Sequence, residues 1–260
     1  MGIVNVTPDS FSDGGRFLDP DAAVEHGLRL LDEGADALDV GGESTRPGAA
    51  AVPAEVESAR VVPVIAGLAR RAPGALLSID TTKAAVARAA LDAGARIVND
   101  VSAGADPAML PLVATAGAAI VLMHRRGSAE TMQLDTAYDD VVAEVHGFLA
   151  GRAAAARAAG IVAGRILLDP GIGFGKDAVG NLRLLRELPA LARLGHAVVV
   201  GASRKSFIGM ISGAPVAQRL GGSLAVLADA ATLARLVVRV HDVAATVQFL
   251  TLLAAVRGAA

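Results

Sequence analysis

The stretch RILLDPGIGFGK, residues 165–176, decides the fold. Its apolar run, residues 166–168, is typical of a buried strand in a parallel sheet. Pro170 biases Asp169 away from the helical conformation, so the strand ends with a carboxylate at its carboxyl end. Glycines at positions 171, 173 and 175 then allow a tight turn and a close approach of the backbone to a ligand. A plain strand-to-helix turn and a carboxylate directed into a pocket both fit this stretch, so the choice depends on whether the layout recurs.

The same layout recurs along the chain. Short apolar runs ending in polar residues predict strands at residues 2–7, 37–40, 75–79, 96–98, 119–123, 166–168, 197–200 and 236–240. Helical periodicity predicts helices at 19–33, 53–71, 83–93, 108–116, 138–159, 182–193 and 242–256. This alternation favours the α/β class and a single-domain (β/α)8 TIM barrel over residues 1–260. A doubly wound sheet is the alternative, but it rarely needs eight strand-helix units.

Composition excludes several classes of protein. A net charge of −2 gives no polycation for nucleic acid or an anionic membrane. The absence of cysteine excludes disulfides and thiolate metal sites, which fits a reducing, cytoplasmic location. The uncharged stretch 107–123 carries Pro111 and Gly117, so it reads as a helix, a turn and a strand rather than a membrane span.

Polar side chains gather at one end of the predicted strands. In a barrel the carboxyl ends of the strands form one rim, where active sites are built. Any one of these residues could be a helix cap or a turn former, but capping does not explain all of them together. Their carboxylates, amides and cations indicate a site for a polar heterocycle and an anion. They are Asn5, Asp39, Asp80, Asn99, His124, Asp169, Lys205 and Arg239.

Further groups suited to anions lie in loops beyond the strands. The segment ESTRPG, residues 43–48, offers hydroxyls and a guanidinium for phosphate oxygens, although a surface loop with a solvated arginine is the plainer interpretation. The segment SRKS, residues 203–206, follows the seventh strand, where barrels often bind phosphate. His241 could cap the last helix, but two positions after Arg239 we expect it on the same side and favour an anion contact.

The chain resembles the dihydropteroate synthase family of the folate pathway, which is the target of sulfonamides. The resemblance spans nearly the whole chain and rests on MGIVNVTPDSFSDGG, DVGGESTRPGA, SIDTTK, NDVSAG, LMH, LLDPGIGFGK, GASRKSFIG and VRVHDV, in this order. It implies condensation of 6-hydroxymethyl-7,8-dihydropterin diphosphate with p-aminobenzoate to 7,8-dihydropteroate, with release of diphosphate. It also implies Mg²⁺ as cofactor and a homodimer packed through outer helices.

The resemblance further implies a role for each site residue. Asp169 would accept hydrogen bonds from the two donors of the pterin, an arrangement that a carboxylate binds bidentately. The pterin-binding residues would be Asp80, Asn99, Asp169 and Lys205. Asn5 would hold the metal, and diphosphate would bind to Asn5, Thr45, Arg46, Arg239 and His241. The p-aminobenzoate-binding residues would be Phe11, Pro47, Lys205 and Ser206. The catalytic residues would be Asp80, Lys205, Arg46 and Asn5.

Some features depart from the family pattern. The sequence begins inside the first predicted strand, whereas family members have a preceding segment, so we expect a partly open lower end of the barrel. Leu233 and Arg235 stand where the family has small residues, and Arg follows His124 where Met is frequent. Two alternatives are a pterin-binding barrel for methyl transfer and a non-catalytic pterin-binding paralogue. Neither needs the ESTRPG and SRKS loops or the cations of the rim, so the synthase is favoured.

Overall fold

The computed structural model describes residues 1–7, 19–45, 48–128 and 130–259. Within these residues the strands form one eight-stranded sheet, whose spatial order follows the chain and whose neighbours are all parallel. Most strand residues are apolar and buried, as is typical of parallel sheets. They are β1 (Gly2–Asn5), β2 (Ala37–Gly41), β3 (Leu76–Asp80), β4 (Ile97–Asp100), β5 (Ala119–Met123), β6 (Ile166–Asp169), β7 (Ala197–Val200) and β8 (Leu236–Val238).

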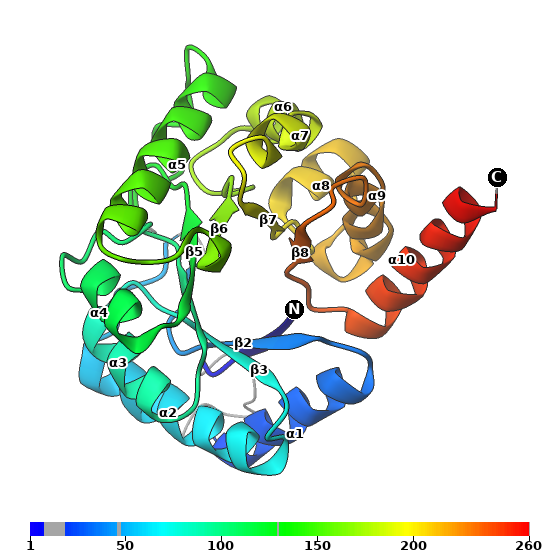
Figure 1. Ribbon diagram of the computed structural model, residues 1–260. Helices are drawn as coiled ribbons and strands as arrows, with labels where there is room; N and C mark the ends of the chain where they lie inside the picture. The colour runs from blue at the N-terminus through cyan, green and yellow to red at the C-terminus, as the bar shows by residue number, and fades with distance from the viewer. Residues whose placement is uncertain (8–18, 46–47, 129, 260) are drawn as a thin grey trace.

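Helices connect the strands and cover the outside of the curled sheet (Figure 1). They are α1 (Pro20–Asp32), α2 (Ala54–Arg71), α3 (Ala84–Asp92), α4 (Met109–Ala116), α5 (Val141–Ala158), α6 (Ala178–Arg186), α7 (Leu188–Ala192), α8 (Ser206–Ser212), α9 (Leu220–Ala230) and α10 (Val243–Gly258), with short 3-10 turns at Ala163–Arg165 and Val216–Gln218. Among the described residues, no helix has the length and apolar character needed to cross a membrane. The α/β class and the eight parallel strands predicted from the sequence are confirmed.

The first and last strands of the sheet also contact each other. Gly2 and Val240 form an isolated parallel bridge just beyond the end of β8. The backbone N–H of Ile3 donates to the Val240 carbonyl at 3.1 Å, and the N–H of Val240 donates to the Met1 carbonyl at 3.0 Å. The two edges that an open sheet would expose to solvent therefore lie against each other at this point.

The helix predicted at residues 182–193 is wrong as a single element, because two helices occupy this region. The first, α6, begins earlier, where Asp177 caps it by accepting a hydrogen bond from the N–H of Gly180 at 2.6 Å. It ends at Arg186, and α7 begins at Leu188 with Pro189 in its first turn. Pro189 has no N–H to continue the hydrogen bonds of α6, but proline is tolerated at the start of a new helix.

The amino ends of the strands surround an apolar cavity of about 550 Å³ at the lower face of the sheet. Ala37, Ile97, Ala119 and Leu167 line it from four strands, and Leu250 of α10 closes one side. Its charged groups, including Arg96 and Asp36, come from positions next to the strand starts. The lower face is thus incompletely filled by side chains.

Candidate active site

The described residues of the predicted site lie at the opposite, carboxyl end of the sheet. Asn5, Asp80 and Asp169 are the last residues of their strands, and Asn99 precedes the last residue of β4. Lys205 and Arg239 follow β7 and β8. Because all eight strands are parallel, their carboxyl ends meet on one rim, and the sequence prediction of a shared rim is borne out in position. Phe11, Arg46 and Pro47 lie outside the described residues.

Arg239 lies at the centre of a buried cluster of charges. Its Nε donates to Asp39 Oδ2 at 2.6 Å, and its Nη2 donates to Asp80 Oδ2 at 2.7 Å. Asn99 Nδ2 donates to the same Asp39 oxygen at 2.9 Å. Burial lowers the pKa of Arg239, but the carboxylates of Asp39 and Asp80 raise it more, so the net pKa is above its ordinary value. The guanidinium therefore stays charged and joins the segment after β8 to β2 and β3.

Asp80 is the carboxylate of this cluster whose protonation is most altered. Burial is the largest cause, and it raises the pKa of Asp80 to about 7. The guanidinium of Arg239 opposes that shift, whereas nearby carboxylates, Asp39 first among them, add to it. A carboxyl group with a pKa near neutrality can exist in either protonation state under physiological conditions, which is frequent among groups that take part in catalysis.

Asp169 is fixed by the glycine-rich turn that follows it. Its Oδ1 accepts a hydrogen bond from the N–H of Gly171 at 2.7 Å. Gly171 has a φ of +68°, and a Cβ there would lie 1.9 Å from the His124 carbonyl oxygen, so only glycine fits the turn. Burial raises the pKa of Asp169 to about 6, against the opposing effects of the Gly171 N–H and the cations of Lys205 and Lys176. Each carboxylate oxygen can accept a second hydrogen bond, so Asp169 keeps acceptor capacity for a ligand.

Lys205 lies between this carboxylate and an aromatic ring. Its Nζ is 3.9 Å from the centroid of the Phe174 ring, a cation–π distance. Burial and the charge of Arg239 lower the pKa of Lys205 to about 8, while Asp169 and Asp80 oppose this shift. Ser206, the next residue, is exposed and begins α8.

Two further predicted residues have polar environments at the same rim. Ser203 Oγ and His241 Nδ1 are 3.0 Å apart, and the backbone N–H of His241 donates to the same hydroxyl at 3.3 Å. Thr45 and Asp80 both line a cavity of about 240 Å³, together with Glu43 and Arg125. Asn5 is half-buried at the end of β1.

Sequence reasoning missed an ion-pair cluster that includes the first residue of the ESTRPG segment, Glu43. Lys83 Nζ contacts Glu57 Oε2 at 2.5 Å and also pairs with Glu43. Burial lowers the pKa of Lys83, but the two carboxylates raise it more. The side chain of Glu57 is fully buried on the face of α2 that also carries Val61 and Val64. Their spacing, i, i+4 and i+7, was a signal in the sequence, because a glutamate on an apolar helix face needs a buried partner.

Lys176 is a second group whose role the sequence did not reveal. This buried ammonium donates to three backbone carbonyls, those of Gly171, Phe174 and His124, at 3.0, 2.9 and 3.3 Å. Burial lowers the pKa of Lys176 to about 7, with Asp169 opposing the shift. The contacts tie the glycine-rich turn to the end of β5, and so help to hold Asp169 and Phe174 in place.

Comparison with known proteins places this geometry in one family. Residues 1–241 match the family model described as pterin binding enzyme. The dihydropteroate synthase of Mycobacterium leprae is 52% identical over 263 residues, covering 98% of this chain and 92% of the relative. The structure of Xanthomonas albilineans dihydropteroate synthase with 4-aminobenzoic acid has 53% identity and a TM-score of 0.92, and covers 99% of this chain and 92% of that one.

Two other solved structures are similar over the same span. The same Xanthomonas albilineans enzyme in complex with 7,8-dihydropteroate has 50% identity, a TM-score of 0.89 and coverage of 99% and 92%. Yersinia pestis dihydropteroate synthase in a sulfonamide drug complex has 43% identity, a TM-score of 0.92 and coverage of 98% and 93%. This chain therefore belongs to the dihydropteroate synthases, within the family of pterin binding enzymes.

Proposed function

We propose that this chain condenses 6-hydroxymethyl-7,8-dihydropterin diphosphate with p-aminobenzoate to form 7,8-dihydropteroate and diphosphate. The observation that carries the proposal is the rim itself, where two buried carboxylates, Asp80 and Asp169, lie close to Lys205 and Arg239. Carboxylates suit the donor groups of a pterin, and the cations suit a diphosphate. Membership of the dihydropteroate synthases adds the reaction that joins these two ligands.

In this proposal the pterin lies against Asp169, Asn99, Asp80 and Lys205. Asp169 and Asn99 supply acceptor and amide groups that the fold holds rigidly, since both are buried and hydrogen-bonded. Lys205 supplies a donor for the pterin carbonyl and ring nitrogen. Rigid polar groups of this kind orient a heterocycle at little further cost in entropy.

The reaction breaks the bond between the pterin methylene carbon and the diphosphate oxygen, and the electron pair leaves with the diphosphate. Arg239 and His241, with Thr45 and Arg46 from the ESTRPG loop, bind the leaving group and stabilise its negative charge. Asp80 stabilises the positive charge that develops on the methylene carbon. The amine nitrogen of p-aminobenzoate forms the new bond and loses a proton. Ser206 takes the carboxylate of p-aminobenzoate, and Phe11, Pro47 and Lys205 enclose its ring.

Mg²⁺ fits this site as an ion that arrives with the diphosphate. Among the described residues, no group of three or more His, Cys, Asp or Glu side chains could hold a metal on its own. Mg²⁺ commonly takes one or two protein oxygens and completes its shell with substrate phosphates and water, and the amide oxygen of Asn5 at the rim would be such a ligand. When bound, the ion neutralises charge on the leaving diphosphate.

The proposal also includes three structural features: a closed barrel, a single domain and a homodimer. We infer that the sheet closes into a (β/α)8 barrel, which the hydrogen bonds of Val240 with Ile3 and with Met1 support, and that residues 1–260 form one domain. We also infer a homodimer packed through outer helices. Exposed apolar side chains on α10, Leu252 at 64% and Val256 at 67% exposure, support that inference. Light scattering coupled to gel filtration measures the oligomeric state directly.

The experiment that tests the proposed reaction measures diphosphate release from the pterin diphosphate, with and without p-aminobenzoate. Release that depends on p-aminobenzoate, together with formation of 7,8-dihydropteroate, is the expected result. Pterin binding without any release would instead identify a non-catalytic pterin-binding protein. Omitting Mg²⁺ and adding a chelator in the same assay is expected to abolish release.

A further inference from the structure

The loop after β7 contains a residue with an unusual backbone conformation. Arg204 has a φ of +57°, in the left-handed region that residues with a Cβ rarely adopt. Among the described residues, Ala103 is the other non-glycine residue with a positive φ. Such a conformation persists only where surrounding contacts hold it, and it is concentrated at functional sites.

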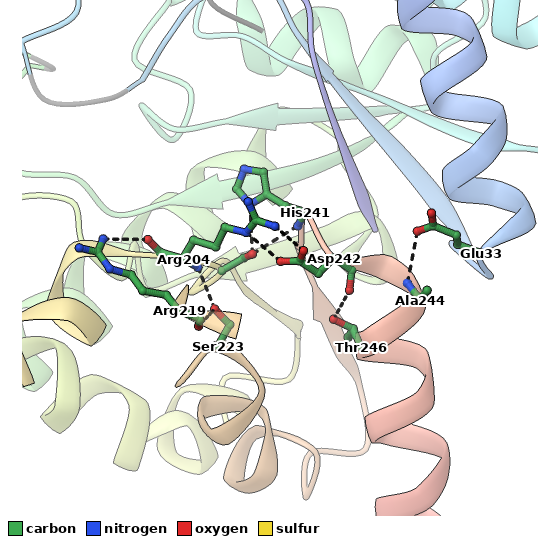
Figure 2. A network of polar contacts seen from close by, with 9 residues as sticks. Glu33, Arg204, Arg219, Ser223, His241, Asp242, Ala244 and Thr246 are labelled. Atoms are coloured by element: carbon green, nitrogen blue, oxygen red, sulfur yellow. Dashed lines mark hydrogen bonds and ion pairs between the residues drawn. The ribbon is translucent and has the colours of Figure 1, made fainter. Parts of the chain in front are cut away.

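Contacts to Arg204 come from both sides of the loop. Its Nε donates to Asp242 Oδ2 at 2.9 Å, and its Nη2 pairs with Asp242 Oδ1, which makes a bidentate ion pair. Its backbone N–H donates to Ser223 Oγ at 2.9 Å, and its carbonyl accepts from Arg219 Nη1 at 3.2 Å. Figure 2 shows this network, with the guanidinium of Arg204 reaching Asp242 at the start of α10. The side chain, the backbone N–H and the backbone carbonyl of Arg204 are thus all engaged in hydrogen bonds.

The residues on either side of Arg204 face different parts of the site. Ser203 Oγ lies 3.0 Å from His241 Nδ1, on the side proposed to bind diphosphate. Lys205 Nζ lies over Phe174, on the side of Asp169. A left-handed residue between Ser203 and Lys205 reverses the direction of the chain locally, which allows the two neighbours to reach these separate partners.

We propose that Arg204 is a positioning residue for the condensation reaction, acting through its ion pair with Asp242. It sets the placement of Lys205 and Ser206 relative to His241, which precedes Asp242 in the chain. The pair joins the two segments that follow β7 and β8, so the groups for p-aminobenzoate and for diphosphate keep a fixed spacing. The inference rests on the proposed function, because it assigns roles to Lys205, Ser206 and His241 in that reaction.

The test uses two substitutions that remove the ion pair in different ways. Arg204→Gly removes the guanidinium while glycine adopts the positive φ without strain. Asp242→Asn removes the carboxylate charge and keeps the size of the side chain. We expect each variant to lower kcat/KM for p-aminobenzoate roughly tenfold or more, as loss of orientation does, with a melting temperature close to that of the unmodified chain. The double variant is expected to be no worse than the poorer single variant, because both changes break one contact.

A matched control removes a similar charge at another helix start. Asp140 caps α5 and forms an exposed ion pair with Arg183 at 3.2 Å, and Asp140→Asn is expected to leave kcat and KM unchanged. Steady-state kinetics and calorimetric binding of p-aminobenzoate to the enzyme preloaded with pterin and magnesium diphosphate report the effect. The inference is overturned if Arg204→Gly keeps the kinetic constants of an active unmodified chain, or if its loss of activity only follows a loss of folded protein. An unmodified chain that forms no dihydropteroate would instead overturn the proposed function.

Discussion

The two ends of the sheet are built from the same strands but contain different chemistry. At the carboxyl end, Asp39, Asp80 and Asp169 are buried beside Arg239 and Lys205. At the amino end, strand residues such as Ala37 and Leu167 surround an apolar cavity of about 550 Å³. Burying charges costs free energy that partners must offset, whereas unfilled apolar space only forgoes packing energy. Changes at the carboxyl end should therefore alter function most, and changes at the amino end should alter stability alone.

The largest expected effect comes from the groups at the centre of the rim. We expect Asp80→Asn and Lys205→Ala each to lower kcat by roughly 100-fold, because both charges act on the reacting ligands. Both variants are expected to stay folded, since the apolar core is untouched, and only Asp80→Asn is expected to differ in melting temperature by an amount that depends on pH. Steady-state kinetics and calorimetric unfolding measure the two quantities. A large drop in melting temperature in both variants, with turnover retained at low temperature, would contradict the division between the two ends.

A smaller and more selective effect is expected at Asp169. In Asp169→Asn, the amide oxygen can keep the hydrogen bond from the Gly171 N–H, which turns the NH₂ group toward the pterin donors. A donor facing a donor should weaken pterin binding by about 1–3 kcal/mol. The affinity of p-aminobenzoate for the preloaded enzyme should change far less. Isothermal calorimetry with each ligand tests this, and unchanged pterin affinity would refute the assignment.

The charged groups of the rim should also make the stability of the fold depend on pH. Burial raises the pKa of Asp80 from 3.8 to about 7. An acid with a higher pKa in the folded state stabilises the fold when protonated, so this contribution is lost as the pH rises toward and through that value. The melting temperature of the unmodified chain relative to Asp80→Asn should therefore fall as the pH rises from about 4 to about 7 and level off above that. Asp92→Asn, which removes an exposed carboxylate from α3, supplies the baseline. A difference that does not vary with pH would show that Asp80 has an ordinary pKa.

The smallest effect is expected at the amino end. Ala119→Leu adds apolar atoms to the lower cavity and should raise stability by about 0.5–2 kcal/mol, without changing kcat. Ala154→Leu, on the exposed side of α5, is the matched control for the change in residue type. Denaturant unfolding measures both. A loss of activity in Ala119→Leu would show that the two ends are coupled.

The strands and the rim could be predicted because both follow from local pattern. The run at residues 119–123 is apolar, follows Gly117 and ends before His124, and β5 has those bounds. Asp169 could be placed because Pro170 and the glycines fix the end of its strand. The helix at 182–193 was wrong because a single proline outweighed a favourable periodicity on both sides of it.

The partners of the charged groups could not be predicted, because they depend on contacts across the fold. Arg239 binds Asp39 and Asp80, which are 200 and 159 positions away in the sequence. Nothing local marks that pairing, and the family resemblance placed Arg239 only among the diphosphate-binding residues. The bidentate contact between Arg204 and Asp242 likewise joins two loops that only the curled sheet brings together.

The pairing of Arg239 with Asp39 and Asp80 bears on how the enzyme copes with the inorganic anions of a cell. A phosphate or chloride ion that approached this guanidinium would have to displace two carboxylates that are already in contact with it. The pterin substrate brings its own hydrogen-bond donors to Asp80 in the proposed complex. These donors replace the contact that Asp80 loses when the diphosphate binds Arg239. We therefore expect these ion pairs to make Arg239 less accessible to simple anions than to a ligand that carries both hydrogen-bond donors and an anionic group.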